Sequence, residues 1–270
     1  MRVVVLSTFP WLDRHAYKHH FLQQLARKPY VKAADVVLVY GKTRLADYSR
    51  EASKLGWRES LSRLFPSKKE GQLPVARQNP GPGARATTSQ SLRATATALN
   101  MRVHLFPSLG DQPCIKFLKA FDPDAVINLG GQYVPRAVLQ LARNGVFSAH
   151  YAELPAIRGS DTVRWSLLLD RPLAVTHISL APALDMGDIL RLERVAIRNG
   201  DSFGDVYRRC QDVATAGHLE LLDALHQGAV GRLPQRRSQG QLFYRMGRHL
   251  REKVDNLLRH NSYSHYVQAD

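Results

Sequence analysis

Short runs of apolar residues recur along the first half of the chain, and stretches with helical spacing of apolar positions separate them. Continuous apolar runs are typical of strands buried on both faces of a sheet, and their alternation with helices indicates parallel pairing. The predicted strands are residues 2–6, 35–40, 102–106 and 124–129. The predicted helices are residues 15–28, 111–121 and 135–143. We therefore expect an α/β fold built on a mostly parallel, twisted, Rossmann-like sheet.

A further buried strand is predicted for residues 145–149, and it ends on His150. An ionisable group at the C-terminal end of a strand is how open α/β sheets present reactive side chains to a crevice. Ser148, two residues before His150, is expected on the same face of that strand. A helix should follow over residues 161–170, with Asp161 as its N-cap.

Two alternating segments, 174–180 and 189–197, predict a pair of neighbouring strands. The loop between them contains Asp185, and a loop of this length can return a carboxylate to the edge where His150 emerges. Imidazole exchanges protons near neutral pH, because its ordinary pKa is about 6.5. We therefore predict that His150 and Asp185 are spatial partners.

Helical spacing resumes in residues 203–226 and again in 241–260. The second stretch is amphipathic and basic, so it is expected either to pack on the core with its charged face in solvent, or to contact a nucleic acid or another subunit. We predict a catalytic domain over residues 1–199, with a polar insertion at about 66–98. A helical, basic extension over residues 200–270 would follow, and its helices could form an oligomer contact.

The net charge is +15, from 38 Lys and Arg residues against 23 Asp and Glu residues. Such a balance favours a polyanionic partner, which includes tRNA, a nucleotide-linked substrate, a phosphorylated cofactor or a membrane surface, unless the whole proteome is basic. The 44% hydrophobic content excludes wholesale disorder. No apolar run is long enough to span a membrane or to form a signal peptide, so we expect a cytoplasmic protein without membrane contact.

The sequence offers little that indicates a metal or a dinucleotide. Cys114 and Cys210 are far apart, and the His residues of the first predicted helix have no carboxylate at metal spacing. No Gly-x-Gly-x-x-Gly follows the first predicted strand, which counts against a dinucleotide fold of the NAD type. We predict no metal site.

A series of short motifs begins on the predicted His150 strand. They are Ser148-Ala149-His150, Leu154-Pro155, Arg158-Gly159, Trp165, Val175-Thr176 and Asp185-Met186-Gly187. In order and spacing they resemble the formyltetrahydrofolate-dependent formyltransferases, whose pattern is Asn-x-His, Leu-Pro, Arg-Gly, a Trp in the next helix, a Val-Thr strand and Asp-x-Gly before Ile-Leu. The departure among the reacting residues is Ser148, where the family has Asn.

The resemblance implies the formyltransferase fold, with N10-formyltetrahydrofolate as the donor of a formyl group to an amine. It implies that His150 and Asp185 act in catalysis, with Ser148 as a hydrogen-bond donor to the developing oxyanion. The donor is expected to contact Gly131, Gln132, Tyr133, Val134, Leu154, Pro155, Ala183 and Leu184. The acceptor is expected to contact Arg158, Gly159 and Arg164.

The acceptor amine is expected to belong to a small molecule: an amino sugar, a nucleotide-linked sugar or an amino acid derivative. Methionyl-tRNA is the alternative, because the chain is basic. The tRNA enzymes of the family add a β-barrel domain, however, and the residues after Ile197 show no series of alternating strands. Two further alternatives are hydrolysis of formyltetrahydrofolate and a catalytically degenerate binding protein, since Ser148 replaces Asn.

Overall fold

The computed structural model describes residues 1–8, 15–40 and 91–266. The chain divides into two compact units, one of residues 1–40 with 88–270 and one of residues 41–87. The second unit lies outside the described residues, as does most of the predicted polar insertion. The sheet, its helices and the cavity described below belong to the first unit.

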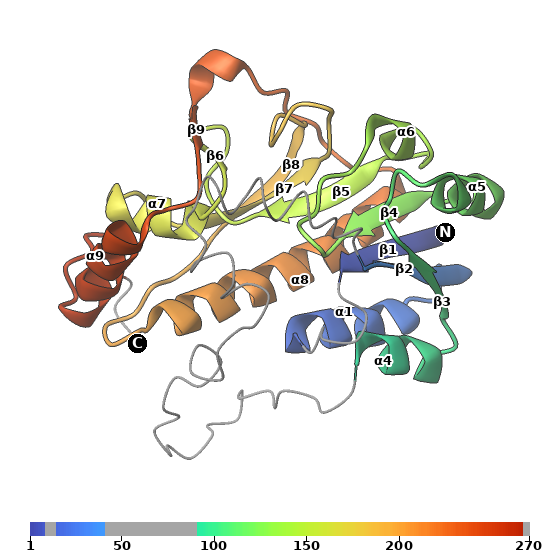
Figure 1. Ribbon diagram of the computed structural model, residues 1–270, viewed down its shortest axis with the longest axis horizontal. Coiled ribbons are helices and arrows are strands. Elements are labelled where there is room, and N and C mark those ends of the chain that lie inside the picture. The colour runs from blue at the N-terminus through green and yellow to red at the C-terminus, as the bar shows by residue number, and fades with distance from the viewer. Residues whose placement is uncertain (9–14, 41–90, 267–270) are drawn as a thin grey trace. The chain divides into compact units, whose positions relative to one another are not determined.

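A seven-stranded sheet organises this unit, in the order β3-β2-β1-β4-β5-β7-β8. Strands β1 to β5 pair in parallel, and β7 and β8 extend the sheet as antiparallel strands (Figure 1). The α/β class, the mostly parallel sheet and the antiparallel pair beside the His150 strand confirm the prediction. The strands are β1 (Arg2–Thr8), β2 (Ala33–Val39), β3 (Arg102–Phe106), β4 (Ala125–Asn128), β5 (Val146–His150), β7 (Ala174–Ser179) and β8 (Ile189–Arg194).

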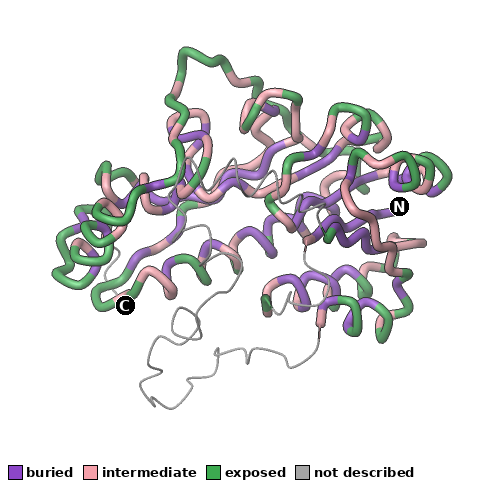
Figure 2. Tube along the Cα trace, in the orientation of Figure 1, coloured by how far each residue is buried: buried purple, intermediate pink, exposed green. Residues whose placement is uncertain are grey.

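Helices cover both faces of the parallel strands. One face carries α1 (Ala16–Ala26), α4 (Leu92–Ala98) and α8 (Phe203–Gln227), and the other carries α5 (Gln112–Phe121) and α6 (Arg136–Leu139). Successive side chains of a strand point to opposite faces, so the apolar run of β1 serves both cores. Val3 and Val5 pack toward the first set of helices, and Val4 and Leu6 toward the second. Figure 2 shows the resulting burial along the central strands.

The strand order places a switch point between β1 and β4, because the chain winds outward from β1 in one direction and from β4 in the other. Ligands of open α/β sheets bind at such a point, outside the carboxyl ends of the strands. Thr8 ends β1, and Asn128 ends β4. The topology alone therefore directs attention to this edge of the sheet.

The segment beyond residue 199 packs against the rest of the unit. Helix α8 contacts α1, β5 and β7, and α9 (Arg248–Arg259) contacts α7 (Thr162–Leu168). Strand β9 (Gln241–Phe243) pairs in parallel with β6 (Ile157–Gly159). The division at residue 199 stays a prediction. No helix among the described residues combines the length and the apolar character needed to cross a membrane.

Two local predictions are wrong. Residues 92–98 of the predicted polar insertion form α4, whose N-terminus is capped by the Ser91 hydroxyl accepting from the Ala94 amide at 3.3 Å. The last helix begins at Arg248 rather than at residue 241, because residues 241–243 pair as β9. Asp161 is the N-cap residue of α7, as predicted, but its side chain makes no capping bond; its carboxylate accepts from the Met246 amide at 2.9 Å.

Candidate active site

A cavity of about 620 Å³ lies at the carboxyl ends of β4 and β5. Its walls are residues 129–134, residues 180–185, the first turn of α1 and one side of α8. A volume of several hundred Å³ is typical of sites that enclose small molecules. The cavity therefore occupies the position at which the strand order predicts a ligand.

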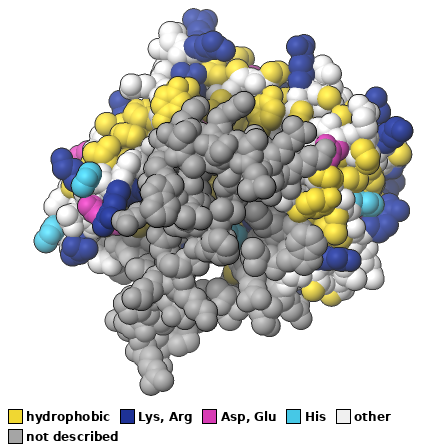
Figure 3. All heavy atoms as spheres, viewed as in Figure 1, with side chains coloured by type: hydrophobic (Ala, Val, Ile, Leu, Met, Phe, Trp, Pro, Cys, Tyr) yellow, Lys and Arg dark blue, Asp and Glu magenta, His cyan; other side chains and the backbone are white. Residues whose placement is uncertain are grey.

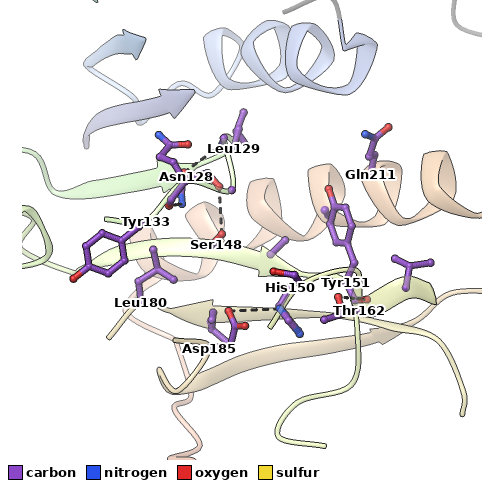
Figure 4. Close-up of a pocket in the computed structure, with 18 of the residues that line it drawn as sticks. Asn128, Leu129, Tyr133, Ser148, His150, Tyr151, Thr162, Leu180, Asp185 and Gln211 are labelled. Carbon is purple, nitrogen blue, oxygen red and sulfur yellow. Dashed lines mark hydrogen bonds and ion pairs between the residues drawn. The ribbon is translucent and has the colours of Figure 1, made fainter. Parts of the chain in front are cut away.

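His150 is the last residue of β5, and its buried ring lies on the cavity wall. Ring nitrogen Nε2 is 2.8 Å from the Ile157 carbonyl oxygen. A carbonyl oxygen can only accept, so Nε2 carries the hydrogen of the neutral ring, and Nδ1 is the nitrogen without one. Nδ1 lies 3.6 Å from Oδ1 of Asp185 (Figure 4). The structure thus brings the two residues together, with the exchangeable nitrogen on the side of the carboxylate.

Asp185 is held by several bonds. Its φ of +51° is a left-handed conformation that Asp tolerates better than most residues. The Gly159 amide donates to its Oδ2 at 2.8 Å. The Gln235 amide nitrogen donates to the carbonyl oxygens of Asp185, at 3.1 Å, and of Gly187, at 2.5 Å. A Cβ at Gly187 would lie 1.6 Å from the Ser179 carbonyl oxygen, so only glycine fits there. The carboxylate therefore keeps a fixed position beside His150.

Ser148 lines the cavity two residues before His150. Its hydroxyl donates to the backbone carbonyl of Asn128, the residue beside it on β4, at 3.4 Å (Figure 4). The hydroxyl predicted to reach a developing oxyanion is therefore turned toward the neighbouring strand.

The loop after β4 supplies the predicted donor contacts Gly131, Gln132, Tyr133 and Val134, all of which line the cavity. Both polar atoms of the Gln132 amide are buried without a hydrogen-bond partner among the described residues. Such orphaned groups are costly unless a ligand satisfies them. Tyr133 is 71% exposed, and Leu184, on the opposite loop with Ala183, is 59% exposed. An unpaired amide and two exposed apolar side chains suit a flat, polar-edged ring such as a pterin.

Leu154, Pro155 and Arg158 do not line the cavity. Leu154 is buried, and its amide donates to the Thr176 hydroxyl at 3.2 Å. The buried Arg158 guanidinium donates to the carbonyl oxygens of Arg237, at 3.2 Å, and Gly240, at 2.9 Å. These groups hold the loop before β6 and the C-terminal segment. The cavity wall does not include these three residues, and their ligand contacts stay a prediction.

Gly159 and Arg164 do line the cavity, as expected for acceptor contacts. The Arg164 guanidinium lies 3.6 Å from the centroid of the Phe203 ring and 3.8 Å from Oδ1 of Asp161. Burial lowers the pKa of this guanidinium, although Asp161 opposes the shift. Its Nε is buried without a partner among the described residues. A half-desolvated cation with unused donors favours an anionic group on a ligand.

Helix α8 forms a wall of the cavity that the sequence interpretation missed. Its contributing residues are Phe203, Tyr207, Gln211, Ala214, Thr215 and His218. They recur at three- and four-residue spacing. This spacing predicts a helix, but it does not show which face of the helix borders a cavity. The sequence interpretation also missed Asn128, because no motif around it indicates chemistry.

Groups that could hold a metal are absent from the described part of the chain, where no cluster of three or more His, Cys, Asp or Glu residues occurs. Both cysteines are buried and unpaired. Burial raises the pKa of the Cys114 thiol to about 11 and that of Cys210 to about 12. Neither thiol is therefore activated as a nucleophile.

Known proteins resemble this chain both in sequence and in fold. Methionyl-tRNA formyltransferase of Chlorobium chlorochromatii is 26% identical over 151 residues, which are 56% of this chain and 48% of that protein. The chain spans about half the length of the curated relatives it matches.

Two solved structures share the fold. A sugar N-formyltransferase from Shewanella superposes with a TM-score of 0.57 at 14% identity, over 100% of this chain and 93% of that one. An N-formyltransferase from Helicobacter canadensis, solved with folinic acid and dTDP-3-aminofucose, gives a TM-score of 0.56 at 12% identity, over 91% of this chain and 71% of that one.

Residues 2–222, which include the whole cavity wall described above, match the family model described as formyl transferase. The described unit also shares its fold with solved formyltransferases, which agrees with that match. The chain belongs to the formyl transferase family.

Proposed function

We propose that this protein is an N-formyltransferase that moves a formyl group from N10-formyltetrahydrofolate to the amine of a small acceptor. The observation that carries the proposal is the cavity in which His150 Nδ1 faces Asp185, with the unpaired Gln132 amide on the same wall. The pair of His150 and Asp185 suits proton transfer, and the unpaired Gln132 amide suits a polar ring. A volume of about 620 Å³ leaves room for part of a donor and part of an acceptor together.

The residues present fit a folate donor on the side of the 130–134 loop. Gln132 offers an amide, the loop offers main-chain groups, and Tyr133 and Leu184 offer apolar surface. When bound, the donor supplies the carbonyl carbon that the amine attacks. This side of the cavity would hold and orient that carbonyl, and the side of α8 would hold the acceptor.

His150 is the proposed acid–base group. Its Nδ1 would take a proton from the attacking amine, while Nε2 stays bound to the Ile157 carbonyl oxygen and fixes the ring. Asp185, 3.6 Å away, would stabilise the imidazolium that forms. A positioned acid–base group of this kind contributes roughly 10²- to 10⁴-fold to a rate.

Arg164 supports an acceptor that carries an anionic group, such as a nucleotide-linked amino sugar or an amino acid derivative. The guanidinium lies on the cavity wall with a buried donor unused. An N-formyltransferase of this fold, from Helicobacter canadensis, was solved with dTDP-3-aminofucose, a nucleotide-linked amino sugar.

Methionyl-tRNA is the second candidate acceptor. Two observations favour it: the sequence relatives are methionyl-tRNA formyltransferases, and the net charge of the chain is +15. A basic surface attracts a polyanion whatever the chemistry of the site.

The test has two parts. Calorimetry with 5-formyltetrahydrofolate, a stable analogue of the donor, should show saturable binding, and no heat at millimolar analogue would contradict the proposal. A transfer assay with a radiolabelled formyl donor should then be run against dTDP- and UDP-linked amino sugars, amino acids and initiator methionyl-tRNA. Transfer to a small amine is the expected result, and transfer to the tRNA alone would select the second candidate.

A further inference from the structure

The oxygen of a formyl group gains negative charge when an amine attacks its carbon, and catalysis requires a hydrogen-bond donor at that oxygen. At the ends of β4 and β5 the cavity offers few side-chain donors. The Ser148 hydroxyl is directed to the Asn128 carbonyl, and the Nε2 hydrogen of His150 to the Ile157 carbonyl. His150 Nδ1 is the site of proton exchange. None of these three groups has a hydrogen in place for the oxygen.

Asn128 brings a carboxamide to the same place from the neighbouring strand. It is the register partner of Ser148 in the parallel β4–β5 pair, so both side chains leave the same face of the sheet. The two positions are one strand spacing apart, about 4.8 Å. Asn128 is 5% exposed and lines the cavity with Ser148 and His150.

The amide of Asn128 is oriented by two bonds within its own loop. Its Oδ1 accepts from the Gly130 amide at 3.2 Å, and its Nδ2 donates to the Gln132 carbonyl oxygen at 3.2 Å. These bonds use the carbonyl oxygen and one of the two Nδ2 hydrogens. Among the described residues Nδ2 makes no second hydrogen bond. The group is thus a fixed donor with one hydrogen to spare, in a buried position on the cavity wall.

We propose that Asn128 supplies the side-chain amide that binds the formyl oxygen during transfer, in place of the hydroxyl of Ser148. The inference rests on the formyl transfer proposed above. In that reaction a bond forms between the acceptor nitrogen and the formyl carbon, and the bond from that carbon to the donor nitrogen breaks. The proton lost by the amine passes to His150 and then to the departing nitrogen. Asn128 takes no part in the proton transfer; its Nδ2 hydrogen stabilises the charge on the oxygen.

The strand register explains how Ser148 can stand where the family pattern has Asn. Asn128 and Ser148 leave the same face of the sheet as register partners, and both line the cavity. An amide on either side chain would therefore stand at the same end of the cavity. An asparagine at position 148 should therefore be able to replace Asn128 in catalysis. It could not do so if Asn128 had only a structural role.

The decisive variants are Asn128→Asp, Ser148→Asn and the double substitution, each in the full chain. Asp keeps the size of Asn and an oxygen for the Gly130 amide, but it removes both Nδ2 hydrogens. The kcat of formyl transfer to the best acceptor of the panel should fall about 100-fold in Asn128→Asp. The double variant should recover most of that loss, because Ser148→Asn returns an amide donor to the site. Asn144→Asp is the matched control: it makes the same change at an exposed asparagine that does not line the cavity, and we expect it to leave kcat unchanged.

Two results would overturn the inference. One is an unchanged kcat in Asn128→Asp. The other is a loss in Asn128→Asp that follows weaker binding of 5-formyltetrahydrofolate and that Ser148→Asn does not restore, which would make Asn128 a support of the loop only. Failure of the proposed function would be visible separately, because the unsubstituted protein would then transfer no formyl group to any acceptor.

Discussion

At the scale of single residues, the orientation of the His150 ring decides what it can do. The Ile157 carbonyl fixes the hydrogen on Nε2 and leaves Nδ1 for proton exchange beside Asp185. His150→Gln separates the two functions, because its amide can still donate to the carbonyl but has no basic nitrogen. We expect kcat to fall by roughly 10²- to 10⁴-fold while 5-formyltetrahydrofolate still binds.

The control for this variant is His260→Gln, which alters an exposed histidine after α9 and should leave kcat unchanged. Steady-state formyl transfer and calorimetry are the two measurements. A His150→Gln protein with nearly full turnover would remove His150 from the proposed mechanism.

The residues of the candidate site could be predicted from the sequence only where one motif carries them. His150 and Asp185 were expected to meet because an antiparallel loop returns to the end of a strand, and they are 3.6 Å apart. Asn128 could not be found in this way, since its relation to Ser148 depends on the register of two strands separated by a helix. Arg158 illustrates the reverse: an Arg-Gly motif indicates chemistry, yet the guanidinium binds two backbone carbonyls of the tail.

At the scale of elements, the C-terminal segment holds the loop that carries Asp185. Leu233 pairs with Ile189 through reciprocal backbone bonds of 2.8 Å, and the Gln235 amide binds the carbonyls of Asp185 and Gly187. Gln235→Leu removes these side-chain bonds and keeps a side chain of comparable volume. The expected result is a fall of kcat/KM on the order of tenfold, because each lost hydrogen bond is worth about 1 kcal/mol.

Gln241→Leu serves as the control for Gln235→Leu, since Gln241 is an exposed residue of the same segment. The midpoint of thermal unfolding should be measured for both variants. A loss of kcat/KM in Gln235→Leu without a change at the control supports a positioning role, and equal kinetics in the two variants would contradict it.

Burial of two histidines between α8 and β7 makes stability depend on pH. His177 and His218 are almost fully buried, and their rings meet edge to face at 4.8 Å. Burial lowers the pKa of both, and the neighbouring His177 adds to the shift of His218. The unfolded chain binds protons at these sites below about pH 6.5 and the folded chain does not, so the free energy of unfolding falls as pH drops below that value.

Urea unfolding measured at a series of pH values below 6.5 tests this expectation. Each histidine should contribute a slope of about 1.4 kcal/mol per pH unit, and His218→Phe should remove one such slope while retaining a ring against Phe21. His260→Phe, at an exposed site, should leave the slope unchanged. Equal slopes in the wild type and His218→Phe would show that His218 does not resist protonation in the folded state.

The central elements were predictable because their apolar runs are unambiguous, and β3 has the predicted bounds. The elements that escaped prediction depend on distant partners. Strand β9 exists because residues 157–159 offer it an edge, and Gly240 permits the approach, since a Cβ there would lie 1.6 Å from the Pro155 carbonyl oxygen. Helix α4 was missed because Leu92 is its only large apolar residue, so the helical spacing of Leu92 and Ala96, which pack in the core, gives a weak signal.

At the scale of the whole molecule, the net charge of +15 bears on which acceptor is used. Figure 3 shows Lys and Arg side chains scattered around the edge of the visible described surface rather than gathered in a single stripe. A scattered charge attracts any anion over a distance, whereas a polyanion that binds by many phosphate contacts needs cations aligned with its backbone. The visible described surface shows no such alignment, and the small anionic acceptor that we propose would contact Arg164 in the cavity.

Salt dependence of the acceptor KM distinguishes the two proposed acceptors. Binding through 6–10 phosphate contacts weakens by about 10³- to 10⁵-fold between 50 and 200 mM salt, and binding through one or two contacts weakens by about tenfold or less. We expect the smaller change for the best acceptor of the panel. Arg164→Gln should raise the KM for an anionic acceptor and flatten its salt dependence, because the contact that salt screens is removed.

Arg248→Gln, which alters an exposed arginine at the start of α9, is the control and should change neither quantity for a small acceptor. A steep loss of affinity with salt that is sensitive to Arg248 and indifferent to Arg164 would instead favour tRNA bound across the surface.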